Sequence, residues 1–184
     1  MGRHKMLLPW ADSSVLGHSI GVWGKLGAHQ IAVVVASDDE QLAAELSRIN
    51  FPAKNRSLNP APDQGMFSSI RLAAQWPTWD DSLSHLVIAL GDQPHLKQQT
   101  LRALLDFSAA NPERICQAQY QGHARHPVIL PKGYFAQLGK SSVTNLKEFL
   151  EEHIADRAFR EIADPGLDLD LDTWTDYEAV RNML

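Results

Sequence analysis

The fold is decided by the stretch Leu86-Val-Ile-Ala-Leu90, which is followed at once by Gly91-Asp92-Gln93-Pro94. A short apolar run that ends in a turn signature is typical of a strand buried in a parallel sheet. Ligands of such sheets bind beyond the carboxyl ends of the strands, near a topological switch point. We therefore expect Asp92 to project from a strand end into a ligand crevice.

Segments of the two kinds alternate on both sides of this strand. Further strands are predicted at residues 31–35, 115–120 and 127–130, the last two joined by a turn around Gly122. Helices are predicted at residues 15–26, 38–49, 65–75, 96–107, 145–153 and 175–182. Such alternation favours a single α/β domain over residues 1–184, with three layers: a mostly parallel sheet and helices on both of its faces.

Composition excludes several classes of protein. The chain has 184 residues, of which 44% are hydrophobic and 21% charged, as in a globular domain. The net charge of -5 argues against a nucleic-acid binder. The lone Cys116 cannot form an internal disulfide, and no run reaches the length of a membrane span or resembles a signal peptide. We therefore expect a cytoplasmic protein with no membrane partner.

Two acidic segments are candidates for a metal site. A carboxylate at Asp92 can hold Mg²⁺, which prefers oxygen ligands and bridges to substrate phosphates. Asp172, in Leu169-Asp-Leu-Asp-Thr173, supplies the second carboxylate that such an ion uses. Each has an alternative reading, since Gly-Asp-x-Pro is common in turns and Asp172 with Thr173 can cap the final helix.

Two polar segments are candidates for substrate contacts. Asn59 precedes Gly65-Met-Phe-Ser68-Ser69, where the glycine permits close approach and the hydroxyls and helix N-terminus tolerate an anion. Simple helix capping by Ser68 or Asp63 is the alternative. The turn from Gly122 to Pro127 carries His126 and can face a phosphate or form a solvated hairpin. No cysteine–histidine spacing indicates zinc, and no Gly-x-Ser-x-Gly pattern indicates acyl transfer.

The order of these segments resembles the MobA-like nucleotidyltransferases, in particular the molybdenum cofactor cytidylyltransferase branch. The opening Met-Gly-Arg3-His-Lys5-Met-Leu-Leu is similar to the family's Met-Gly-x-x-Lys-x-Leu-Leu. The Asn…Gly-x-x-Ser-Ser, Asp-Gln-Pro, Gly-x-x-x-x-Pro and Asp-x-Asp-Thr patterns follow in register, from Met1 to about residue 180. The resemblance thus spans essentially the whole chain.

The resemblance implies transfer of a nucleotidyl group from an NTP, with CTP favoured, to a phosphorylated acceptor such as molybdopterin cofactor. Pyrophosphate is released, and a protein partner from the molybdoenzyme pathway is a further expectation. The implied catalytic residues are Lys5 and Asp92; nucleotide contacts are Arg3, Lys5, Asn59, Gly65, Ser68 and Ser69; acceptor contacts are Gly122 and His126; Mg²⁺ ligands are Asp92 and Asp172. Alternatives are a non-catalytic nucleotide or pterin binder, a guanylyltransferase and a sugar-phosphate nucleotidyltransferase.

Two departures from the family pattern add expectations. The family's first strand and glycine loop fall before Met1, so we expect the natural protein to be roughly 15–20 residues longer. We expect weak or absent triphosphate binding by the 184-residue form, because that loop supplies phosphate contacts. Gly139-Lys140-Ser-Ser-Val143 stands where the family has Gly-Asp-x-Gly-Ala-Arg, which leaves the acceptor open.

Overall fold

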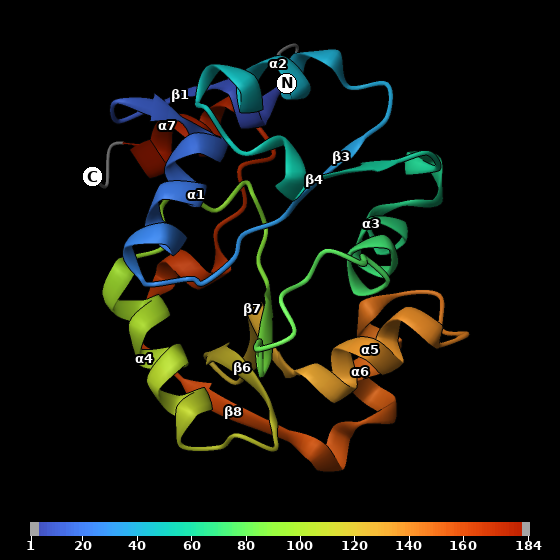
Figure 1. Cartoon of the computed structure of the whole chain (residues 1–184). Helices are drawn as coiled ribbons and strands as arrows, with labels where there is room; N and C mark the ends of the chain where they lie inside the picture. The colour runs from blue at the N-terminus through green and yellow to red at the C-terminus, as the bar shows by residue number, and fades with distance from the viewer. Residues whose placement is uncertain (1–3, 182–184) are drawn as a thin grey trace.

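The computed structural model describes residues 4–181 and has an α/β architecture (Figure 1). The helices are α1 (Val15–Lys25), α2 (Glu40–Arg48), α3 (Met66–Ala74), α4 (Gln98–Ala109), α5 (Lys132–Lys140), α6 (Leu146–Glu152) and α7 (Trp174–Arg181). The strands are β1 (Pro9–Trp10), β2 (Ser13–Ser14), β3 (Val33–Ala36), β4 (Arg56–Asn59), β5 (His85–Ile88), β6 (Ile115–Tyr120), β7 (His123–Pro131) and β8 (Arg157–Glu161). None of the helices within residues 4–181 is long and apolar enough to cross a membrane.

The central sheet has the strand order β5-β7-β6-β8, and its pairings are mixed. The β6 and β7 strands form a tight hairpin, because Gln121 and Gly122 both adopt positive φ angles of 49° and 77°. That turn makes β7 antiparallel to β6 and β5, while β8 pairs in parallel with β6. The expected α/β fold is confirmed, and the hairpin is the reason that the sheet is mixed rather than mostly parallel.

Helices cover both faces of this sheet, as the sequence predicted. Alternate residues of a strand point to opposite faces, and Ile115 and Leu130 pack against α3, α5 and α6. Cys116 and Ile129 face the other way and pack against α4 and the end of α1. Figure 1 shows α4 on one side of β6, β7 and β8 and the pair α5 and α6 on the other.

The two ends of the described chain meet in a small core of their own. Trp10 and Tyr177 are each 1% exposed, and their rings form an edge-on contact with centroids 6.1 Å apart. Leu8, Val15 and Leu171 complete this cluster. Figure 1 shows α7 beside β1. The packing brings the segment around residue 172 next to the segment around residue 5.

A second, two-stranded sheet pairs β3 with β4 in parallel, and an open cavity of about 890 Å³ separates β3 from β5. Among residues 4–181, β3 pairs with β4 alone and β5 with β7 alone, so each strand presents one open edge. The sequence predicted that both strands are buried. Val33, Val34, Val87 and Ile88 are instead partly exposed, because they line this cavity.

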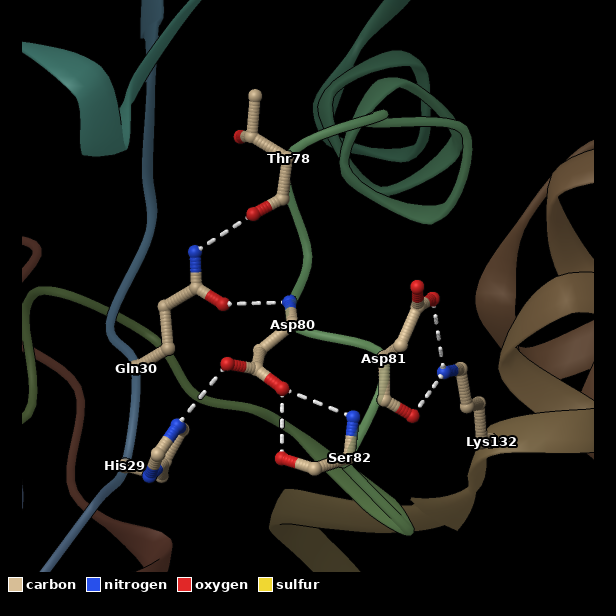
Figure 2. A network of polar contacts seen from close by, with 7 residues as sticks. All are labelled: His29, Gln30, Thr78, Asp80, Asp81, Ser82 and Lys132. Atoms are coloured by element: carbon tan, nitrogen blue, oxygen red, sulfur yellow. Dashed lines mark hydrogen bonds and ion pairs between the residues drawn. The ribbon is translucent and has the colours of Figure 1, made fainter.

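A polar tether joins the two sheets where β3 and β5 begin (Figure 2). The Gln30 side chain donates to the Thr78 carbonyl over 2.9 Å and accepts from the Asp80 amide over 3.0 Å. His29 lies 3.3 Å from the Asp80 carboxylate. Hydrogen bonds from the hydroxyl and amide of Ser82 lower the pKa of Asp80 to about 2. The tether therefore fixes the amino ends of both strands and leaves the cavity open between them.

Candidate functional site

Lys5 holds two aspartates that are far apart in the sequence. Its Nζ atom lies 2.6 Å from Asp92 Oδ2 and 3.1 Å from Asp172 Oδ1. The two carboxylate oxygens are therefore separated by no more than the sum of those distances. The sequence predicts that Asp92 and Asp172 lie close together, and their shared contact with Lys5 shows that they do.

Local structure explains how each aspartate reaches this point. Asp92 follows β5 in a turn that packs closely, since a Cβ atom on Gly91 would lie 3.0 Å from Met6 Cε. Asp172 lies between Leu171, which is fully buried, and Thr173. The Thr173 hydroxyl accepts from the Asp176 amide, and the Asp176 carboxylate accepts from the Thr173 amide and hydroxyl. This capping box caps α7, so Asp172 is left for Lys5 and the capping alternative for Asp172 is wrong.

The pKa of Lys5 reports the balance of forces at the site. Partial burial disfavours the charged ammonium, but hydrogen bonds and charge attraction from Asp92 and Asp172 outweigh it and raise the pKa of Lys5. Lys5 is thus a cation at neutral pH. Its ammonium keeps two carboxylates together that would repel each other if they were alone.

The same oxygen atoms suit a divalent cation. Mg²⁺ is commonly bound by one or two carboxylates together with substrate phosphates and water. Asp92 and Asp172 provide two such ligands, on a site whose side chains are open to solvent. Residues 4–181 contain no cluster of three or more Asp, Glu, His or Cys side chains arranged for a metal. The donor set therefore fits a substrate-bridging ion and not an all-protein metal cage.

Asn59, Ser68 and Ser69 form one hydrogen-bonded group beside the cavity. Asn59 is 3% exposed and donates its amide to Ser68 Oγ over 2.7 Å and to Ser69 Oγ over 2.9 Å. Its Oδ1 atom accepts from the Ala61 amide. The Asn59 amide is therefore committed to the protein, so Asn59 orients the two hydroxyls. The N-cap of α3 is Gly65, with a φ of 81° and no side-chain cap, so Ser68 does not cap this helix.

His126 and Gly122 lie in different places. His126 is half-buried on β7, with Nδ1 3.4 Å from the Ile88 carbonyl. Burial lowers the pKa of His126, although the Ile88 carbonyl, Asp92 and Asp170 oppose this effect, so the ring is neutral at pH 7. Gly122 is at the exposed hairpin tip, about 13 Å of strand away, and its amide faces the Glu161 carboxylate. Arg3 falls outside the described residues.

Ser69, Met6 and Asp92 all line the cavity between β3 and β5, so one hydroxyl of the Asn59 group and one of the two carboxylates border the same space. A model of the MobA-like NTP transferase domain matches residues 1–158. The chain belongs to this family. The sequence expectation of the family and of the fold is confirmed.

Relatives of the MobA-like chain support this assignment. The chain is 26% identical to molybdenum cofactor cytidylyltransferase of Escherichia coli K12 over 182 residues, and this match covers 98% of the chain and 88% of that protein. It is 25% identical to the Rv0371c protein of Mycobacterium tuberculosis H37Rv in complex with manganese, with a TM-score of 0.71 over 98% of this chain and 92% of the other. A nucleotidyl transferase from Methanothermobacter thermautotroptrophicus matches with a TM-score of 0.77 at 16% identity, over 98% and 85%.

The MobA-like chain is therefore a nucleotidyltransferase of the cytidylyltransferase-like kind. Sequence reasoning missed two side chains behind Asp92, namely His95 and the buried Asp164. The Asp164-Pro165-Gly166 turn signature was the available signal. In the segment from Gly122 to Pro127, the guanidinium of Arg125 pairs with the Asp168 carboxylate.

Proposed function

We propose that this enzyme transfers a nucleotidyl group from an NTP, preferentially CTP, to a phosphate-bearing acceptor such as molybdopterin cofactor, with release of pyrophosphate. The observation that carries the proposal is the convergence of Asp92 and Asp172 on the Lys5 ammonium. Two carboxylates and one lysine at the end of a strand are the groups needed to hold a cation and neutralise phosphates. A protein partner from the molybdoenzyme pathway stays a prediction.

In this proposal the chain positions charge and does little covalent work. Asp92 and Asp172 hold Mg²⁺, which when bound would stabilise negative charge on the α-phosphate. Lys5 would then contact a phosphate of the nucleotide instead of the two carboxylates and neutralise its charge. Ser68, Ser69 and the start of α3 contact the nucleotide. Gly122 and the neutral His126 are proposed to contact the acceptor. Of the two, His126 is the stronger candidate, because Gly122 lies at the hairpin tip, away from His126 and the Ile88 carbonyl beside it.

Calorimetry with CTP, GTP and ATP in the presence of Mg²⁺, paired with a pyrophosphate-release assay, tests the proposal. CTP-selective binding with pyrophosphate release upon addition of a molybdopterin acceptor is expected. Nucleotide binding without pyrophosphate release would favour the non-catalytic alternative. Selective GTP binding would favour guanylyl transfer.

The matched variants are Asp92→Ala, Asp172→Ala and Asp81→Ala. Asp81 is an exposed aspartate that pairs with a lysine, Lys132, over 3.8 Å and lies at the opposite end of β5. The first two variants should lose Mg²⁺-dependent turnover by about 10²-fold or more, while Asp81→Ala keeps it. Near-normal turnover of Asp92→Ala would contradict the metal assignment.

A further inference from the structure

Asp92 and Asp172 sit on separate segments, so something must fix the distance between them. Asp92 is in the turn after β5, and Asp172 follows the short 3-10 helix η5 (Pro165–Asp168). Neither segment is part of a strand or a long helix at these positions. Apart from Lys5, contacts between η5 and the turn after Asp92 also join the two segments.

A buried carboxylate anchors the start of η5. Asp164 is 4% exposed, and its Oδ2 atom accepts a hydrogen bond of 2.5 Å from the Thr100 hydroxyl on α4. Its Oδ1 atom accepts from the Gly166 amide over 3.0 Å, and Lys97 Nζ lies 3.8 Å away. Buried carboxylates are stable only when they are paired and hydrogen-bonded, and this one is. The anchor ties η5 to the first turn of α4.

His95 makes the second tie, from the turn that carries Asp92. Its Nε2 atom lies 3.0 Å from the Gly166 carbonyl oxygen. A carbonyl only accepts, so Nε2 carries the hydrogen. A Cβ atom on Gly166 would lie 3.5 Å from His95 Cδ2 and 3.1 Å from Asp164 Oδ1, so the three residues are in close contact. His95 thus connects the Asp92 turn to η5 directly.

We propose that His95 is a positioning residue for the transfer reaction: its bond to Gly166, together with the Thr100–Asp164 bond, sets the separation of Asp92 and Asp172. The inference rests on the proposed role of these two aspartates as metal ligands. His95 touches neither carboxylate, and it acts by holding the two segments in register. Groups that orient metal ligands commonly affect metal affinity without contacting the metal.

The test compares three variants of the whole chain. His95→Ala removes the tie, and His95→Gln retains an N–H donor at a similar reach. His85→Ala is the matched control, because His85 Nε2 also lies 2.9 Å from a backbone carbonyl, that of Pro112, but at the other end of β5. The measurements are the dissociation constant for Mn²⁺, followed by electron paramagnetic resonance, and the thermal midpoint of unfolding.

His95→Ala should raise the Mn²⁺ dissociation constant roughly tenfold, and His95→Gln should restore most of the affinity. His85→Ala should keep the wild-type constant even if it lowers the thermal midpoint. Wild-type Mn²⁺ affinity in His95→Ala would overturn the inference. So would an equal loss of Mn²⁺ affinity in His85→Ala, because the effect would then not be specific to the tie between His95 and Gly166.

If the wild-type chain binds no Mn²⁺, the proposed metal role fails, and the positioning inference is decided separately by a crystal structure of His95→Ala. Loss of the Lys5 contact to either Asp92 or Asp172 in that structure would support the inference. Retention of both contacts would overturn it.

Discussion

Lys5 Nζ lies 2.6 Å from Asp92 Oδ2, so the opening segment of the chain and the turn after β5 meet in one ion pair. The ammonium also contacts Asp172 and occupies the position from which a divalent cation would contact both carboxylates. The ion pair thus keeps the site assembled before substrate arrives. In the proposed metal role of the two aspartates, a divalent cation would compete with Lys5 for the same oxygen atoms.

Replacing Lys5 separates its two roles. Lys5→Ala should lower kcat/KM for the nucleotide by about 10²-fold, because a phosphate charge loses its partner. The same variant should bind Mn²⁺ in the absence of nucleotide at least as tightly as the wild type, because the competing ammonium is gone. Steady-state kinetics and Mn²⁺ titration measure the two effects. Lys132→Ala, which removes a lysine paired with Asp81 far from the site, is the control and should leave both unchanged.

Thr173→Ala removes the N-cap of α7 beside Asp172. The free energy of unfolding should fall by about 1 kcal/mol in urea denaturation. Ser14→Ala is a matched cap removal, since Ser14 Oγ accepts from the Gly17 amide over 3.0 Å at the start of α1. Both variants should lose similar stability, but only Thr173→Ala should also weaken Mn²⁺ binding. Equal Mn²⁺ affinity in the two variants would show that the cap does not position Asp172.

Three histidines should make the protein less stable in mild acid. Burial lowers the pKa of His18, His95 and His126 below the ordinary value of 6.5. As pH falls through 6.5 the unfolded chain takes up these protons before the folded chain does, so the free energy of unfolding decreases. Urea denaturation at pH 7.5 and pH 5.5 measures the loss, and His126→Gln should reduce it. Equal stability at the two pH values would contradict the assignment.

Local signals account for much of what could be predicted from the sequence. Apolar spacing and caps located α1, α2, α3, α4, α6 and α7 to within a few residues, and the Gln121-Gly122 turn located the β6–β7 hairpin. The α5 helix was missed because Gly133 and Gly139 weaken its local helix propensity, and the packing of Gly139 against Ala74 compensates. The β8 strand was missed because its residues 157–161 are mostly charged, as is common on an edge strand.

By itself the sequence determined the layer architecture and the family, and it made Asp92 and Asp172 the candidates for a metal site, because hydrophobic periodicity and motif order are local properties of the chain. Only the tertiary structure decided that Lys5 bridges Asp92 and Asp172, that Thr173 and not Asp172 caps α7, and that the Asn59 amide is committed to Ser68 and Ser69. It also decided that His95 reaches Gly166. These contacts join residues brought together by packing, and neither the distance nor the hydrogen-bond partner of a side chain is encoded in any one segment.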